Sequence, residues 1–183
     1  TMEEMLWHKY KWPKKVRKTL QYPDEPLFTV LDKAAEQAGT TPYTFFMGPV
    51  PTFAKTRESA NRVANFLASK GSKKGDRVAI FMPNIPQYPP VFFGILKAGA
   101  ICVTCNPSYK GPELHHQLKD SGARAIFCFD HPHFTPECYE AMKDTKVEFV
   151  VICSIKETLS GAKATLGSAL GKIPKSPFYE KDI

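Results

Sequence analysis

The sequence predicts an α/β fold in which a mostly parallel β-sheet lies between flanking layers of helices. The first observation is a set of short apolar stretches without polar alternation, expected as strands at Arg77–Met82, Ile101–Cys105, Arg124–Phe129 and Glu148–Cys153. The second is that one helical stretch separates each strand from the next. Unbroken apolar strands are typical of a sheet buried on both faces, and single intervening helices are typical of right-handed crossovers between parallel strands. We therefore expect a Rossmann-like, three-layer arrangement.

Apolar residues spaced three and four apart predict the helices. The expected helices are 26–38, Phe53–Lys70, Pro90–Ala98, Pro112–Ser121 and Thr135–Lys143. The first of them is expected to end at Gly39 and to bury the stripe Leu27, Val30, Leu31, Ala34, Ala35 and Ala38. Thr52 is placed to cap the second helix, and Gly71 to end it. We also expect a strand at Tyr43–Met47 before a turn at Gly48-Pro49, and a short helix around Ala162–Leu170.

Composition divides the chain into three regions. Residues 1–24 form a basic, aromatic arm, 25–155 form the α/β subdomain, and 156–183 form a connector rich in Ser, Gly, Lys and Pro. Such an arm fits peripheral contact with anionic lipid or nucleic acid, and it also fits a strap whose rings pack onto the domain. Because no recognition motif accompanies the charge, we favour the strap and expect no nucleic-acid partner. Peripheral membrane contact through the arm remains an open alternative.

The overall composition is that of a globular protein with one sizeable domain. Of the 183 residues, 43% are hydrophobic and 23% are charged, with a net charge of +7. Five cysteines, an odd number without a secretory signal, indicate free thiols and a cytoplasmic protein. The longest apolar run, Val91–Cys105, is interrupted by Lys97 and two glycines, so no membrane-spanning helix is expected.

The carboxyl ends of the expected strands are where an open parallel sheet binds ligands. These ends carry Pro83-Asn84, Asn106-Pro107, Asp130 and Ser154. The amides of Asn84 and Asn106 suit either a ligand contact or an Asx turn. The adjoining prolines favour the turn.

Two patterns that resemble cofactor sites are weak. Residues 161–167 and Gly171-Lys172 contain glycines, but their spacing does not form a phosphate-binding loop, and a flexible linker is the better interpretation. One constellation has the composition of a zinc site: Cys128, His131, His133 and Cys138. Because Cys128 lies inside an expected strand and prolines restrict the loop, ordinary thiols and a polar loop are favoured.

Other candidate catalytic groups also have simpler explanations. Cys102 and Cys105 form a C-x-x-C pattern, but on a strand their side chains point to opposite faces and pack in the core. His115 and His116 share an expected helix with Asp120, without a nucleophile to complete a catalytic series. We interpret both as surface histidines.

An ordered series of short motifs adds a family resemblance. The series is Thr52-Phe53, Asn61-Arg62-Val63-Ala64, Lys74-Gly75-Asp76-Arg77-Val78-Ala79-Ile80, Pro83-Asn84-Ile85-Pro86, Lys97-Ala98-Gly99-Ala100, Asn106-Pro107, Glu113-Leu114 and Asp120-Ser121-Gly122-Ala123. In this order the motifs resemble the N-terminal part of the adenylate-forming superfamily, and within it the fatty acyl-CoA synthetases. Phe53, Pro89-Pro90 and Lys110 depart from the family pattern, which leaves the subfamily open.

The resemblance implies a two-step reaction. A medium- or long-chain fatty acid attacks ATP to give an acyl-adenylate and pyrophosphate, and coenzyme A then displaces AMP, with Mg²⁺ screening the phosphates. In the family, the phosphate loop, the adenine and ribose contacts and the mobile lysine lie downstream of the region matched here. We therefore assign no catalytic, cofactor-binding or metal-binding residue to this chain and expect no cofactor bound to it. The fatty acid would bind through the missing portion.

Two hypotheses follow from the resemblance and the residues. The first is an N-terminal fragment of an AMP-forming fatty acid–CoA ligase, an incomplete α/β subdomain that is inactive alone. The alternative is a stand-alone Rossmann-like module that binds a ligand or partner without catalysis. A fragment of a larger core also exposes apolar surface, so homodimers are expected.

Overall fold

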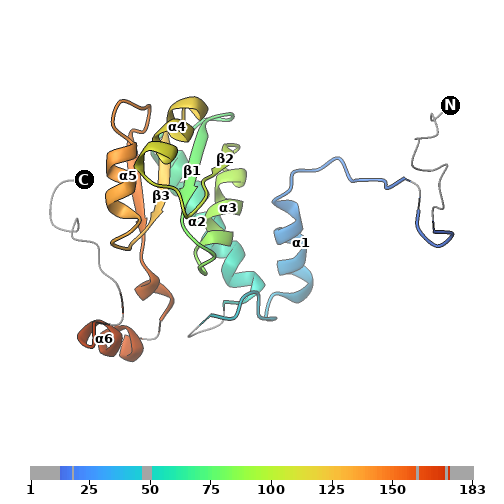
Figure 1. The fold of residues 1–183 in the computed structure, drawn as a ribbon. Coiled ribbons are helices and arrows are strands. Elements are labelled where there is room, and N and C mark those ends of the chain that lie inside the picture. The colour runs from blue at the N-terminus through green and yellow to red at the C-terminus, as the bar shows by residue number, and fades with distance from the viewer. Residues whose placement is uncertain (1–12, 18, 47–50, 160, 172, 174–183) are drawn as a thin grey trace.

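The computed structural model describes residues 13–17, 19–46, 51–159, 161–171 and 173. Its centre is a four-stranded parallel sheet in the order β2-β1-β3-β4, with helices on both faces (Figure 1). The strands are β1 Arg77–Phe81, β2 Ile101–Thr104, β3 Ala125–Phe129 and β4 Phe149–Cys153. The predicted α/β fold and the parallel sheet are therefore confirmed.

The helices lie close to their predicted positions. They are α1 Thr29–Ala38, α2 Phe53–Ser69, α3 Tyr88–Lys97, α4 Gly111–Ser121, α5 Thr135–Ala141 and α6 Gly161–Ala169, with a 3₁₀ turn η2 at Ile155–Thr158. Thr52 caps α2 as predicted, because its Oγ1 accepts a hydrogen bond of 3.3 Å from the backbone N–H of Lys55. Gly71 follows the end of α2 with φ +75°, a left-handed conformation that glycine adopts without strain.

Successive residues of each strand pack against different helical layers. Val78 and Ile80 of β1 contact the cluster formed with α2 and α3, whereas Ala79 and Phe81 contact the cluster formed with α4 and α5. All four side chains are completely buried. A sheet covered on both faces has no solvent side, which explains why its strands show no polar alternation.

The strand predicted at Tyr43–Met47 is wrong for the residues that the structure describes. Pro42 and Thr52 form an isolated antiparallel bridge, and the Tyr43 N–H donates to the carbonyl of Pro51 at 2.8 Å. No strand forms at 43–46, since Pro42 and Pro51 lack the N–H groups that a longer ladder needs. Met47 and the predicted turn at Gly48-Pro49 lie outside the described residues.

Helix α1 buries a narrower stripe than its sequence predicts. Leu31 and Ala35 are buried, but Leu27 and Val30 are each 57% exposed. The reason is that α1 lies outside the three layers and packs on α2 (Figure 1). One polar attachment of α1 is Lys97 of α3, whose Nζ pairs with Asp32 of α1 and also donates to Asn61 Oδ1 of α2 at 2.8 Å.

Helices α2 and α3 lie in close contact at Gly94, a residue without a signal in the sequence. A Cβ atom at this position would lie 2.5 Å from Val63 Cβ and 2.8 Å from the carbonyl oxygen of Ala60. Distances of this size are repulsive, so the position accepts only a hydrogen atom in place of a side chain. The Gly94 contact therefore sets how deeply the outer helix layer can pack.

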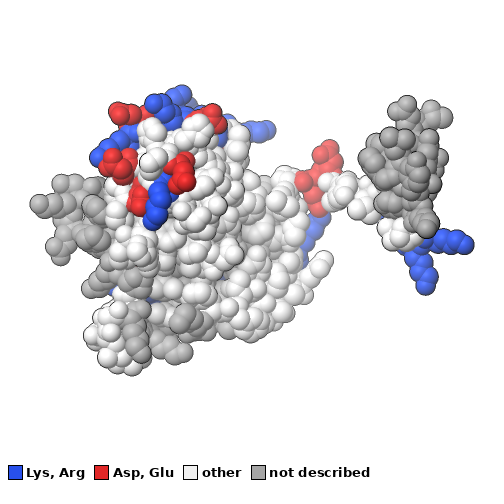
Figure 2. Space-filling view, viewed as in Figure 1, with Lys and Arg blue, Asp and Glu red and all other residues white. Residues whose placement is uncertain are grey.

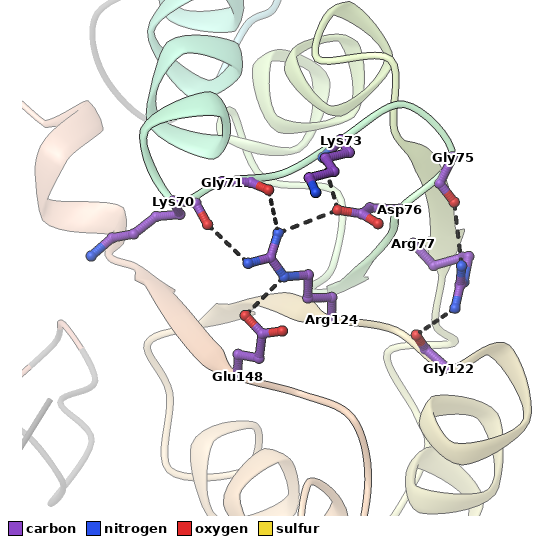
Figure 3. A network of polar contacts seen from close by, with 9 residues as sticks. All are labelled: Lys70, Gly71, Lys73, Gly75, Asp76, Arg77, Gly122, Arg124 and Glu148. Atoms are coloured by element: carbon purple, nitrogen blue, oxygen red, sulfur yellow. Dashed lines mark hydrogen bonds and ion pairs between the residues drawn. The ribbon is translucent and has the colours of Figure 1, made fainter.

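Arg124, the residue before β3, joins several elements at the edge where the strands begin (Figure 3). Its guanidinium donates to the carbonyls of Lys70 (3.0 Å) and Gly71 (2.8 Å) at the end of α2. The same group pairs with Asp76, before β1, at 3.2 Å and with Glu148, before β4, at 2.8 Å. One planar fork therefore joins a helix end to the starts of two strands.

Arg77 forms a second, similar link at the same edge. Its Nε donates to the carbonyl of Ser121 at 2.9 Å and its Nη2 to that of Gly122 at 3.1 Å, where α4 ends in a left-handed glycine (Figure 3). A cation at a helix carboxyl end is favoured by the helix dipole and satisfies carbonyls that lack helical partners. The amino edge of the sheet is thus held together by two arginines.

We predict that Gly94→Ala destabilises the protein, because the new methyl group forces α2 and α3 apart. The expected loss in the free energy of unfolding is about 1–3 kcal/mol, measured by urea denaturation. Gly161→Ala is the matched control, since a Cβ there meets no atom within 4 Å. Equal urea midpoints for the two variants would contradict the close approach at Gly94.

Replacement of Arg124 tests the link at the amino edge. Arg124→Lys is expected to lower the urea midpoint, because an ammonium cannot reach both helix carbonyls and both carboxylates, and Arg124→Met is expected to lower it further. Arg62→Met is the control, since Arg62 is exposed and its polar partners among the described residues, Glu58 and Ser59, lie on its own helix. A midpoint of Arg124→Met equal to that of the control would refute the link.

The Asp76 carboxylate gives this edge a pH dependence. The Lys73 N–H, at 2.8 Å, and the charges of Arg124 and Arg77 hold the pKa of Asp76 below its usual 3.8. A carboxyl group whose pKa is lower in the folded than in the unfolded protein stabilises the fold at pH values above the unfolded pKa. This stabilisation is lost as the pH falls through the folded pKa. Asp76→Asn should therefore lower the urea midpoint at neutral pH. The difference in urea midpoint between the variant and the wild type should become smaller below pH 3.8. The exposed Asp24, as Asp24→Asn, controls for net charge, and a difference independent of pH would contradict the prediction.

Candidate functional site

The carboxyl ends of β1, β3 and β4 lie together, and polar side chains connect them. Ser154, after β4, donates through Oγ to Asp130 Oδ2, after β3, at 2.9 Å. Gln87, immediately before α3, donates through Nε2 to the backbone carbonyl of Ser154 at 2.7 Å. Asp130 and Ser154 are only 2% and 7% exposed, so these hydrogen bonds replace water for buried polar groups. The sequence located Asp130 and Ser154 at this edge, but nothing in it indicated Gln87.

A groove of about 680 Å³ opens beside this polar cluster, between α2, α3, β4 and η2. Its apolar lining includes Val63 of α2, Val91 of α3, Phe127 of β3 and Val151 of β4. Lys55, Arg62, Gln87 and Glu157 supply polar groups to the same lining. An apolar cleft of this size with a few convergent polar groups is the usual form of a small-molecule site.

Two hydrogen-bond acceptors in this groove have unusual surroundings. Gln87 Oε1 is buried and has no hydrogen-bond partner within the described part of the chain. Glu157 remains exposed at the rim, yet the groove withdraws water from its carboxyl and raises the pKa of that group. The Ser154 N–H opposes this increase and the charge of Asp130 adds to it. Gln87 therefore contributes a buried acceptor beside the groove, and Glu157 contributes an exposed carboxylate at its rim.

Of the two asparagines at strand ends, Asn106 forms the predicted turn. Its Oδ1 accepts from the Ser108 N–H at 3.0 Å and from the Ser108 hydroxyl at 2.8 Å, which is an Asx turn. Asn84 is exposed and borders a smaller hollow with Phe45 and Tyr88. The turn interpretation is confirmed for Asn106.

The four residues of the zinc-like constellation do not come together. Cys128 and Cys138 are buried in the core beneath α4 and α5, where a hydrogen bond between them and burial raise the pKa of Cys128. The rings of His131 and His133 instead lie tilted against each other with centres 5.1 Å apart, and His131 Nδ1 accepts the His133 backbone N–H. The described residues contain no group of three or more Cys, His, Asp or Glu side chains that could hold a metal ion.

The C-x-x-C cysteines pack in the core, as the sequence predicts. Cys102 contacts the α2–α3 side of the sheet and Cys105 the α4–α5 side. Burial raises the pKa of each thiol to about 12. Thiols with such pKa values are protonated at neutral pH and are poor nucleophiles.

The remaining candidates have structural explanations. His116 is exposed as predicted, but His115 is half-buried, with Nδ1 3.0 Å from the Ala141 carbonyl, so the surface interpretation of His115 is wrong. The glycine-bearing segment from Gly161 to Gly167 lies in α6, which confirms the short helix expected around Ala162–Leu170. Inside a helix each backbone N–H donates to the carbonyl four residues earlier, so residues within α6 do not present a row of free amides to a phosphate as a loop does.

The charged surface in view carries both signs. Figure 2 shows Lys, Arg, Asp and Glu side chains gathered over α4 and α5, while much of the rest of this face has few charged groups. Mixed charges do not create the one-sign field that attracts nucleic acid. Within the part of the chain that the structure describes, no helix has the length and apolarity needed to cross a membrane.

Comparison with known proteins identifies the relatives of this chain. The family described as AMP-binding enzyme matches residues 31–177. The chain is 41% identical over 143 residues to a long-chain-fatty-acid–CoA ligase of Salmonella typhimurium, covering 78% of this chain and 25% of the relative. It is 36% identical to the ligase of that name from Haemophilus influenzae, covering 98% of this chain and 32% of the relative.

A solved structure agrees with these relatives. The crystal structure of a long-chain-fatty-acid–CoA ligase from Archaeoglobus fulgidus superposes with a TM-score of 0.64 and 27% identity, over 74% of this chain and 28% of that one. The chain thus spans about a quarter to a third of the length of the ligases it matches. With the family matched over residues 31–177, the chain belongs to the AMP-binding enzyme family.

Proposed function

We propose that this chain is the N-terminal part of an AMP-forming medium- or long-chain fatty acid–CoA ligase. The observation that carries the proposal is the similarity to long-chain-fatty-acid–CoA ligases over most of the chain. The reaction would join a fatty acid to ATP as an acyl-adenylate with release of pyrophosphate, and then transfer the acyl group to the thiol of coenzyme A. ATP, Mg²⁺ and coenzyme A all belong to this proposal.

The described residues do not fit the groups that this reaction requires. The glycine-bearing segment is helical, and no cluster of acidic side chains is arranged to hold Mg²⁺ among residues 13–17, 19–46, 51–159, 161–171 and 173. We therefore assign no catalytic, cofactor-binding or metal-binding residue to the chain. The proposed role of residues 25–155 is to form one wall of a larger domain, with 156–183 leading to the portion that binds the fatty acid and ATP.

The location and assembly of the protein also belong to the proposal. We place the ligase in the cytoplasm, with free thiols in a reducing environment. Exposed apolar residues such as Val30 on α1 and Leu27 just before it support the expectation of self-association. Peripheral membrane contact through the arm at 1–24 stays a prediction, since residues 1–12 and 18 lie outside the described residues.

We predict that the chain alone shows no carboxylate-dependent exchange of pyrophosphate with ATP. The physical reason is that the glycine-bearing segment is helical and does not form a phosphate-binding loop. The measurement is exchange of radiolabelled pyrophosphate into ATP with decanoate and palmitate, with the Haemophilus influenzae relative as the positive control. Robust exchange by the chain alone would place an ATP site within it and overturn this part of the proposal.

The alternative is a stand-alone module that binds a ligand without catalysis, and the groove beside Gln87 favours it. Reading the parent gene separates the two functions. A reading frame that continues into a Ser/Thr/Gly-rich loop supports the ligase, and a stop codon directly after Ile183 supports the module.

A further inference from the structure

We propose that the basic arm at 1–24 binds the surface of a bilayer that contains anionic lipid. Its lysine and arginine side chains would pair with the lipid phosphates, and its apolar side chains would enter the boundary between the head groups and the acyl chains. The inference rests on the peripheral membrane contact within the proposed function. Its test does not use the ligase reaction, so the two proposals can fail separately.

Nearly all of the net charge of the protein lies on one stretch of this arm. Residues 5–23 hold six of the 25 Lys and Arg residues and none of the 18 Asp and Glu residues. The rest of the chain therefore carries 19 basic and 18 acidic residues, a net charge of +1 compared with +7 for the whole. A segment with several cations and no acidic residue is attracted to the negative potential at the surface of an anionic bilayer.

The described part of the arm does not pack on the α/β body. Every residue at 13–17 and 19–24 is exposed. Figure 1 shows this stretch running outward from α1, away from the sheet. Figure 2 shows Lys and Arg side chains at its far end, apart from the mixed charges over α4 and α5. The strap interpretation is therefore wrong for these residues, and their side chains are accessible to a partner.

Apolar side chains lie among the cations of the arm. Val16, Leu20 and Tyr22 are 51%, 60% and 80% exposed, and the sequence adds Trp7 and Trp12 to the same arm. Transfer of these groups from water to the head-group boundary is favourable, and Trp and Tyr are enriched at membrane interfaces. Stable attachment of a surface segment usually needs both an electrostatic and an apolar contribution. The arm offers both.

The aliphatic members of this set favour lipid over nucleic acid. Val16 and Leu20 have neither a hydrogen-bonding group nor a π-face with which to bind bases. The α/β body adds no one-sign field along which a phosphate backbone could run, since the charges outside residues 5–23 nearly cancel. A bilayer surface uses both the cations and the apolar groups, so it accounts for the whole arm.

The first experiment uses the intrinsic fluorescence of tryptophan. The chain has two tryptophans, Trp7 and Trp12, and both lie in the arm, so their emission reports on the arm alone. The 183-residue chain is titrated with vesicles of phosphatidylcholine, with and without phosphatidylglycerol, in low and high salt. We expect emission to shift to shorter wavelength only with the anionic vesicles, and the response to weaken in high salt.

Three outcomes of this titration would overturn the proposal. The first is no shift with anionic vesicles, which is the result expected if the rings already pack on the domain. The second is an equal shift with both kinds of vesicle, which would exclude the electrostatic contribution. The third is tighter binding to a single- or double-stranded oligonucleotide than to anionic vesicles at matched phosphate concentration, which would assign the arm to nucleic acid.

Charge variants locate the contact by vesicle sedimentation. The arm variant replaces three exposed cations together: Lys14→Gln, Lys15→Gln and Arg17→Gln. We expect it to bind anionic vesicles about tenfold more weakly than the wild type. The matched control removes the same charge from exposed residues of the α/β body: Lys74→Gln, Lys119→Gln and Lys146→Gln. Equal losses in the two variants would show a response to net charge alone and would refute the assigned site.

A second pair of variants tests the apolar contribution. Leu20→Ser combined with Tyr22→Ser is expected to weaken binding to anionic vesicles about tenfold, because less apolar surface leaves water. Leu166→Ser combined with Leu170→Ser is the control, since these leucines are 61% and 59% exposed but lie outside the arm. Unchanged binding by the arm variant, or an equal loss in the control, would overturn the insertion of the arm into the bilayer surface.

Discussion

The arrangement of this molecule depends on the guanidinium group of Arg124. Parallel strands all begin at one edge of the sheet, so the starts of β1, β3 and β4 and the end of α2 meet there. A planar group with several donors can satisfy two helix carbonyls and two carboxylates at once, which an ammonium cannot. Arg77 makes the equivalent connection to the end of α4. The elements that cover opposite faces of the sheet are thereby fixed to the same edge.

Because the two arginines occupy the amino edge of the sheet, the carboxyl edge is available for ligands. At the carboxyl ends the side chains are short and mostly uncharged, and the buried Asp130 carboxylate is satisfied by the Ser154 hydroxyl. Gln87, in the loop after β1, donates to the Ser154 carbonyl, and its Oε1 atom has no hydrogen-bond partner among the described residues. Parallel sheets generally place their binding sites at this edge, because the loops there diverge to opposite faces. Here the divergence is between the loop to α3 and the loop to α5.

The sheet could be predicted from the sequence because burial on both faces leaves a local signature. Val78 to Phe81 are apolar without interruption, since each residue faces a helix layer. The outer helix α1 could not be predicted as well, because periodicity shows which residues are apolar but not how wide a partner surface covers them. The predicted strand is wrong at residues 43–46 for a related reason. A strand needs a partner with free N–H groups, and the prolines at 42 and 51 lack them.

The candidate site was predicted only in part. Asp130 and Ser154 follow strands and could be placed at the carboxyl edge, whereas Gln87 reaches Ser154 across 67 residues of sequence. The groove and the close contact at Gly94 likewise arise from residues on different elements, whose distances no local pattern encodes. Long-range contacts of this kind become visible only when the packing is known.

The residues that carry the family resemblance are largely those that hold the architecture. Asp76 and Arg77 lie at the amino edge, Gly122 ends α4, and Lys97 joins three helices. These contacts explain why the motif series is specific for a fold, but none of them touches a reacting group in the part that the structure describes. A fold can support several chemistries, so architectural motifs identify the family more firmly than they identify its reaction.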